Sequence, residues 1–138
     1  MDALQQLSNN EKNLLLVSVP MINKNMEFFT IRFYYHFLQT KAKFLFKNTI
    51  IEQQHKMFGS SLYIILTYIA DPEYLENYVG KLAMNHGEYG IIGKYIDDFV
   101  GAFMKALQET LPEDTNSHLF DIWHRVISVI MIFFKSNL

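Results

Sequence analysis

His86 is the residue whose type and position most clearly suggest chemistry. Apolar residues precede it at helical spacing, at Leu75, Val79 and Leu82. Continuing this spacing by four residues reaches His86, which predicts that the imidazole lies on the buried face of a helix. Gly87 and Gly90 should end that helix and leave the ring where a bulky planar partner could approach. A histidine on an apolar face is also common as an ordinary core residue, so spacing alone leaves a metal-ligand role as one interpretation of two.

The composition limits the classes of protein to consider. At 138 residues the chain is long enough for a substantial core, and we expect a single domain over residues 1–138. The net charge of −2 offers no electrostatic argument for binding nucleic acid or an anionic membrane. Because the chain has no cysteine, it cannot use a disulfide, a catalytic thiolate, Cys-ligated zinc or an iron–sulfur cluster.

The amino-terminal residues lack the charged and then apolar layout of a secretion signal. The longest apolar run, residues 126–134, is shorter than the roughly 20 residues that a membrane span needs. We therefore expect a soluble, cytoplasmic protein. Aromatic residues make up 15% of the chain, which would suit either a pocket for a large flat apolar ligand or an ordinary aromatic core.

The elements that must position His86 are all expected to be helices. Strand-like alternation is absent, and the pattern predicts an all-α protein of about six or seven helices. Ser8 and Glu11 form a capping box for the first helix, in which Pro20 should mark a bend or an end. Asp71 and Pro72 should begin the helix that leads to His86. The other main helices are expected over residues 51–69, 95–111 and 117–134, with Ser117 as the cap of the last.

The residues after His86 carry a family resemblance. The order His86, Gly87-Glu88, Tyr89, Gly90, Ile91 resembles the proximal-histidine region of globins, most closely that of single-domain bacterial haemoglobins and of the globin domain of flavohaemoglobins. The resemblance extends over residues 17–134, through a valine-proline stretch at residues 18–22 and through Phe33-Tyr34 in the second helix. It implies a globin fold, a bound haem b and His86 as the proximal ligand of the haem iron.

The resemblance also implies a distal side. Tyr34 and Gln53 would stabilise the bound gas, with Gln54 as the alternative if the helical register shifts by one. His55, about 200° around the helix from Gln53, should then face outward, and Tyr35 is in the wrong phase. The residues expected to line the haem pocket are Phe33, Phe46, Met57, Ile64, Leu82, Tyr89 and Ile91. Lys56 would reach the haem propionates or remain a solvated surface lysine.

The chain departs from these relatives in two places. The corner after Leu38 is about two residues shorter and lacks the usual proline. Tyr95-Ile96-Asp97 replaces the His-Tyr-Pro stretch, so the tyrosine that supports the proximal histidine of these relatives has no counterpart. This argues against strong peroxidase or dioxygenase activation.

The implied function is reversible binding of O2 and of other diatomic gases such as NO and CO. It would serve oxygen delivery or storage, or NO detoxification as a dioxygenase supplied with electrons by a separate reductase. The chain carries no Gly-rich dinucleotide motif of its own. The alternatives are gas sensing and a haem-free globin fold that acts through protein–protein contacts. The presence of His86, Tyr34, Gln53 and Phe46 together favours haem binding.

Overall fold

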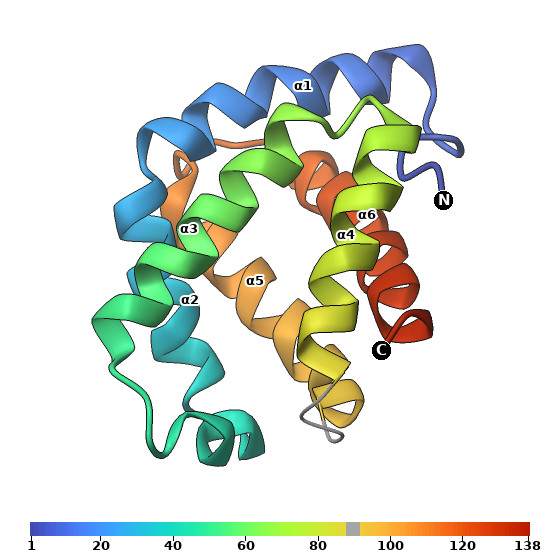
Figure 1. The fold of residues 1–138 in the computed structure, drawn as a ribbon. Helices are drawn as coiled ribbons and strands as arrows, with labels where there is room; N and C mark the ends of the chain where they lie inside the picture. The colour runs from blue at the N-terminus through green and yellow to red at the C-terminus, as the bar shows by residue number, and fades with distance from the viewer. Residues whose placement is uncertain (88–91) are drawn as a thin grey trace.

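Helices build the molecule in the computed structural model, which describes residues 1–87 and 92–138 (Figure 1). The α-helices are α1 (Asn9–Lys24), α2 (Met26–Phe37), α3 (Ile51–Thr67), α4 (Pro72–Gly87), α5 (Ile96–Thr110) and α6 (Ser117–Ser136). Two short 3-10 helices, η1 (Lys41–Phe46) and η2 (Ile92–Tyr95), precede α3 and α5. No strand occurs in the described ranges, and the all-α prediction is confirmed.

The helix starts follow the local sequence closely. The hydroxyl of Ser8 accepts from the Glu11 backbone N–H at 3.1 Å, and the Glu11 carboxylate accepts from the Ser8 N–H at 3.0 Å, which is the predicted capping box. Asp71 caps α4 by accepting from the Tyr74 N–H at 3.1 Å. For α6 the cap prediction was wrong by one residue, because Asn116 accepts from the His118 N–H at 2.8 Å and Ser117 is already helical.

Pro20 was expected to mark a bend or an end of its helix, and the helix does not end there. It lies inside α1, which continues to Lys24. Proline removes one backbone donor, but its side chain is exposed here. The buried residues Ser18 and Ile22 hold α1 against the core on both sides of it. Tertiary packing therefore maintains the helix across the missing hydrogen bond.

The core forms where α2, α5 and α6 meet. The largest fully buried side chains include Trp123 from α6, Phe29 and Phe33 from α2, and Phe103 from α5. The rings of Phe29 and Phe103 pack edge to face with centroids 5.1 Å apart. Trp123 also donates through Nε1 to the Ser18 hydroxyl at 2.9 Å, so a buried hydrogen bond joins α6 to α1. These contacts form the framework on which the remaining helices rest.

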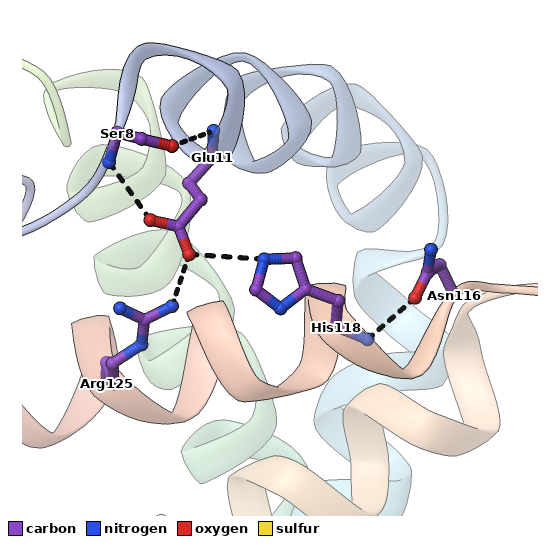
Figure 2. Close-up of polar contacts among 5 residues, drawn as sticks. All are labelled: Ser8, Glu11, Asn116, His118 and Arg125. Carbon is purple, nitrogen blue, oxygen red and sulfur yellow. Dashed lines mark hydrogen bonds and ion pairs between the residues drawn. The ribbon is translucent and has the colours of Figure 1, made fainter.

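Charged side chains reinforce this framework at its surface. Glu11 lies close to both Arg125 and His118, with its Oε2 atom 2.5 Å from Arg125 Nη2 and 3.2 Å from His118 Nε2 (Figure 2). We call Ser8, Glu11, His118 and Arg125 the polar clamp. The Ser8 backbone hydrogen bond and Arg125 lower the pKa of Glu11 to about 2. Glu11 is therefore ionised at neutral pH and ties the start of α1 to α6.

A second ion cluster joins α2 to α5. Glu109 accepts from Arg32 Nε at 2.7 Å and pairs with His36. Burial alone would raise the pKa of Glu109, but the hydrogen bonds from His36 and Arg32 outweigh it and hold that pKa below its usual value. This cluster fixes the outer side of the helix that carries Tyr34.

Among the described residues, α6 alone is long and apolar enough to cross a membrane by length and composition. It also contributes seven buried residues, from Ile122 to Phe134, and packs against α1, α4 and α5. A core helix of this kind meets the same length and hydropathy criteria.

Helices α3 and α4 meet near their short connection and separate toward the end of α4 that carries His86 (Figure 1). The position of α3 is set by its crossing with α2. A Cβ atom added to Gly59 would lie 3.4 Å from the Thr30 methyl group and 3.6 Å from Met26, at ordinary van der Waals contact, so α3 faces α2 at this position. This crossing determines which face of α3 points inward.

Candidate functional site

His86 lies in the last turn of α4, one residue before its end. The buried stripe of this helix passes through Leu75, Val79 and Ala83. Leu82 is half-buried and His86 is exposed, so the expectation that His86 shares the buried face is wrong by part of a turn. Its ring nevertheless contacts α6 through Phe134, with the centroids 5.5 Å apart and the planes at 70°.

The two ring nitrogens of His86 have different environments. Nδ1 lies 2.7 Å from the carbonyl oxygen of Leu82. A carbonyl can only accept, so Nδ1 carries the proton and the neutral imidazole keeps a lone pair on Nε2. Within residues 1–87 and 92–138, Nε2 has no hydrogen-bond partner. A metal-ligating histidine commonly has this arrangement, in which a backbone carbonyl fixes the tautomer and the orientation of the ring.

Tyr34 lies on α2 and is buried. Its ring contacts Phe46 at 5.6 Å, Phe58 at 5.8 Å and His55 at 5.2 Å between centroids. Burial raises the pKa of its phenol well above the ordinary value, which already lies above the physiological range, so the hydroxyl is protonated. No hydrogen bond joins the hydroxyl to another described residue, and its oxygen is not among the fully buried polar atoms that lack a partner.

Tyr34 belongs to a larger group of rings that we call the aromatic cluster: Phe33, Tyr34, Phe37, Phe46, Phe58 and Phe99. Phe33 is its centre and lies 4.4 Å from Phe58, 4.9 Å from Phe99 and 5.2 Å from Phe37 between centroids. Edge-to-face and tilted contacts predominate, as expected for aromatic rings in a core. The cluster joins α2, η1, α3 and α5 beside the Tyr34 hydroxyl.

Phe58 was not among the residues predicted to line the pocket, although its spacing in the sequence marks it as an inward residue of α3. Phe58, Leu62 and Leu66 recur every four residues along α3, and both leucines are buried. This row defines the inward face of the helix. Measured from Phe58 at about 100° per residue, Gln54 lies about 40° away, His55 about 60° away and Gln53 about 140° away.

The outward orientation expected for His55 is wrong. His55 is half-buried and its ring lies against Tyr34 with an interplanar angle of 37°. The prediction failed because it measured the helical phase from Gln53, which is exposed, rather than from Phe58. Gln54, the alternative register, is half-buried on the inward side. The expected pairing of Tyr34 with Gln53 has no contact to support it among the described residues.

The other α3 residues that were expected to contact the haem lie on different sides of the helix. Lys56 and Ile64 line a surface groove of about 970 Å³ against Thr30 of α2. Met57 lies outside that groove and is 63% exposed. Their assignments to the haem pocket and propionates stay predictions.

Phe33 and Phe46 lie in the aromatic cluster, on the same side of the molecule as Tyr34. Tyr35 is exposed and lies under the Arg32 guanidinium at 4.4 Å, which confirms that it is out of phase with Tyr34. The expected pocket residues Tyr89 and Ile91 lie outside the described residues.

The donor set suits one kind of iron site better than others. No group of three or more His, Asp or Glu side chains within the described ranges could hold a metal ion. A bare ion would need several protein ligands, whereas a planar prosthetic group brings its own equatorial ligands and needs one axial imidazole. His86, with its proton fixed on Nδ1, meets that requirement. The described residues therefore fit haem in their chemistry.

Comparison with known proteins gives an independent result. The family model described as Globin matches residues 28–133, more than three-quarters of the chain. A comparison with curated proteins found no match. The matched range begins within α2, before Tyr34, and ends within α6. It includes His86 and the aromatic cluster. The chain therefore belongs to the globin family.

Proposed function

We propose that this protein is a haem-b globin, with one globin domain over residues 1–138, that reversibly binds O2 and other diatomic gases. The observation that carries the proposal is the His86 tautomer, with Nδ1–H donated to the Leu82 carbonyl at 2.7 Å. This hydrogen bond leaves Nε2 as a neutral nitrogen donor at the end of α4. Haem held by Nε2 of His86 would supply the iron to which the gas binds.

Tyr34 acts on the opposite, distal side. Its phenol is protonated at neutral pH, as that of an ordinary tyrosine is, and burial raises its pKa further, so it donates a hydrogen bond and does not compete as an anionic ligand. A protonated donor in a shielded site favours a polar diatomic ligand over an apolar one. The phase of α3 favours Gln54 over Gln53 as the second donor, and His55 restricts the Tyr34 ring from its other face.

The aromatic cluster keeps water away from this site. Phe33, Phe46 and Phe58 surround the Tyr34 ring with apolar surface. A dry environment strengthens each remaining hydrogen bond and would limit the access of solvent species to a bound haem. The cluster thus supports reversible binding rather than oxidation.

The experiment is an absorption spectrum of protein expressed with haem available. We expect one haem per chain and a Soret band. His86→Ala should lose stoichiometric haem, and added imidazole should restore it. His124→Ala, on the exposed side of α6, is the matched control and should bind haem like the wild type. An unchanged spectrum in His86→Ala would remove His86 as the ligand, and no haem uptake by the wild type would favour the haem-free interaction module.

A further inference from the structure

Two tyrosine rings stack face to face at the corner between α3 and α4. The ring centroids of Tyr68 and Tyr74 lie 3.8 Å apart, with 24° between the ring planes. This is the shortest distance between any two aromatic rings in the described residues, where most ring pairs are tilted or edge to face. Both side chains are accessible to solvent, Tyr68 being 36% and Tyr74 42% exposed. The stack therefore differs from the ring packing of the core and lies at the surface.

The backbone of the corner holds the two rings in this arrangement. The Asp71 N–H donates to the carbonyl of Tyr68 at 2.9 Å, and the Asp71 carboxylate accepts from the N–H of Tyr74 at 3.1 Å. The residue next to each tyrosine is anchored in the core, because Ile69 and Leu75 are buried. The stack is thus fixed by the fold and does not depend on a chance encounter of two mobile side chains.

Two phenols in this arrangement suit one kind of reaction. A phenol that loses one electron and one proton becomes a phenoxyl radical, in which the oxygen and the two ortho carbons share the unpaired electron. Two such radicals combine through a bond between one ortho carbon of each ring. Because the rings of Tyr68 and Tyr74 are already in van der Waals contact, this coupling requires no diffusion of one ring toward the other.

Exposure alone does not distinguish the stack from other surface tyrosines. Tyr35 and Tyr63 are 52% and 55% exposed, more than either ring of the stack. Tyr35 packs on His36 and beneath Arg32, and no ring contact within the described ranges joins Tyr35 or Tyr63 to another tyrosine. These two residues share the accessibility of the stack but lack its geometry, so they serve as matched controls.

We propose that Tyr68 and Tyr74 form an oxidative cross-linking site, at which two equivalents of a one-electron oxidant join the rings as a dityrosine. Each phenol gives one electron to the oxidant and one proton to water. The two radicals form one carbon–carbon bond, and the hydrogen on each coupled ortho carbon then moves as a proton to the oxygen of its ring. The product keeps both hydroxyl groups and is lighter than the starting chain by two hydrogen atoms.

The cross-link would close the short connection between α3 and α4 into a covalent ring. The two helices separate from this corner toward the end of α4 that carries His86 (Figure 1). A covalent bond at the corner would restrict the movement of α4 relative to α3. This inference goes beyond the proposed gas binding and does not require haem, because both rings and the contacts that hold them belong to the chain itself.

The test oxidises the full-length protein with light-activated tris-bipyridyl ruthenium and persulfate, which together generate a one-electron oxidant. The product is unfolded and cleaved after glutamate, which places Tyr68 in the fragment 53–73 and Tyr74 in the fragment 74–76. We expect mass spectrometry to find these two fragments joined, with two hydrogen atoms fewer than the separate fragments contain. The joined product should come from a chain that still runs as a monomer on a denaturing gel.

Variants identify the phenols that react. Tyr68→Phe and Tyr74→Phe keep the rings but remove the oxidisable phenol, so each should lower the yield of the joined fragments at least about tenfold. The controls Tyr35→Phe and Tyr63→Phe remove phenols that are at least as exposed and should leave the yield unchanged.

Oxidation of the wild type in concentrated urea separates the folded stack from mere proximity in the sequence. Unfolding removes the stack, so the yield of the joined fragments should fall about tenfold without any substitution. Equal yields from the folded and the unfolded chain would overturn the proposal. A bond to Tyr63 or Tyr78 in place of the expected one, or cross-links that join only separate copies of the chain, would also overturn it.

Discussion

The seam between α1 and α6 and the aromatic cluster are held together by different forces. The seam depends on directional polar contacts: the polar clamp at the surface and the Trp123–Ser18 hydrogen bond beneath it. The aromatic cluster depends on ring packing around a single hydroxyl that no other described residue satisfies. The comparison indicates that polar specificity fixes the framework, whereas the region near the proposed ligand is left apolar, so that its one donor is available for binding.

Removing the centre of the aromatic cluster should have the largest effect. Phe33 is 1% exposed and contacts four other rings. Phe33→Ala should lower the free energy of unfolding by about 3–5 kcal/mol, measured by urea denaturation. Phe33→Leu retains much of the volume and should cost clearly less. Similar losses in both variants would mean that specific ring contacts, rather than filled volume, hold this region.

Removing the Ser18 hydroxyl oxygen should destabilise the contact between α1 and α6. Ser18→Ala leaves the buried indole N–H of Trp123 without its acceptor, which should cost about 1–3 kcal/mol in unfolding free energy. Trp123→Phe in the same background removes the unsatisfied donor, so the two changes should be non-additive. Strict additivity would show that the hydrogen bond contributes nothing to the seam.

Tyr34→Phe should separate ligand binding from stability. It removes the hydroxyl and keeps the ring, so packing in the aromatic cluster is retained. Loss of a donor worth about 1.4–2.7 kcal/mol should speed O2 dissociation about ten- to a hundredfold, while CO dissociation barely changes because CO is less polarised. Stopped-flow O2 release measures the effect.

The matched single variants Gln53→Leu, Gln54→Leu and His55→Leu identify the second donor on α3. The helical phase leads us to expect the larger effect in Gln54→Leu and little change in Gln53→Leu. An unchanged O2 rate in Tyr34→Phe would mean that its hydroxyl points away from the ligand.

The smallest effect should be a pH dependence of the polar clamp. Because the pKa of Glu11 falls from 4.5 to about 2 in the folded protein, its contribution is complete above about pH 4.5 and is lost as the pH drops toward 2. In the wild type, the urea concentration at the unfolding midpoint should fall as the pH is lowered from about 5 to about 2. Glu11→Gln should make this fall smaller, because the substituted side chain does not titrate. Glu109 contributes to the same fall, and its part should remain visible. Glu113→Gln, on the loop before α6, serves as the control, and a fall that Glu11→Gln leaves unchanged would rule out this role.

The features that were predicted correctly are those that neighbouring residues in the sequence determine. Helical periodicity and capping residues gave the all-α class, the start of α4 at Asp71-Pro72, and the capping box at Ser8 and Glu11. The proximal role of His86 stays a prediction, although the surrounding chain proved to be a globin.

The features that were not predicted depend on contacts between segments that lie far apart in the sequence. The phase of α3 follows from the packing of Phe58 against Phe33 and Tyr34 of α2, and without that contact in view His55 was assigned to the wrong side. Pro20 was expected to mark a bend or an end, but α1 continues past it because contacts with residues distant in the sequence stabilise the helix. The pairing of Glu11 with Arg125 joins residues 114 positions apart, and no local pattern marks it.

The Trp123–Ser18 hydrogen bond has a consequence for the order of folding. It joins positions 105 residues apart and thus closes a loop of most of the chain. Contacts of such long range form late, because the entropy of closing the loop must be overcome first. During synthesis α1 leaves the ribosome first, yet it cannot complete its docking until α6 has emerged. Because Trp123 is the one tryptophan of the chain, its fluorescence should record the arrival of the first helix as one of the last steps of folding.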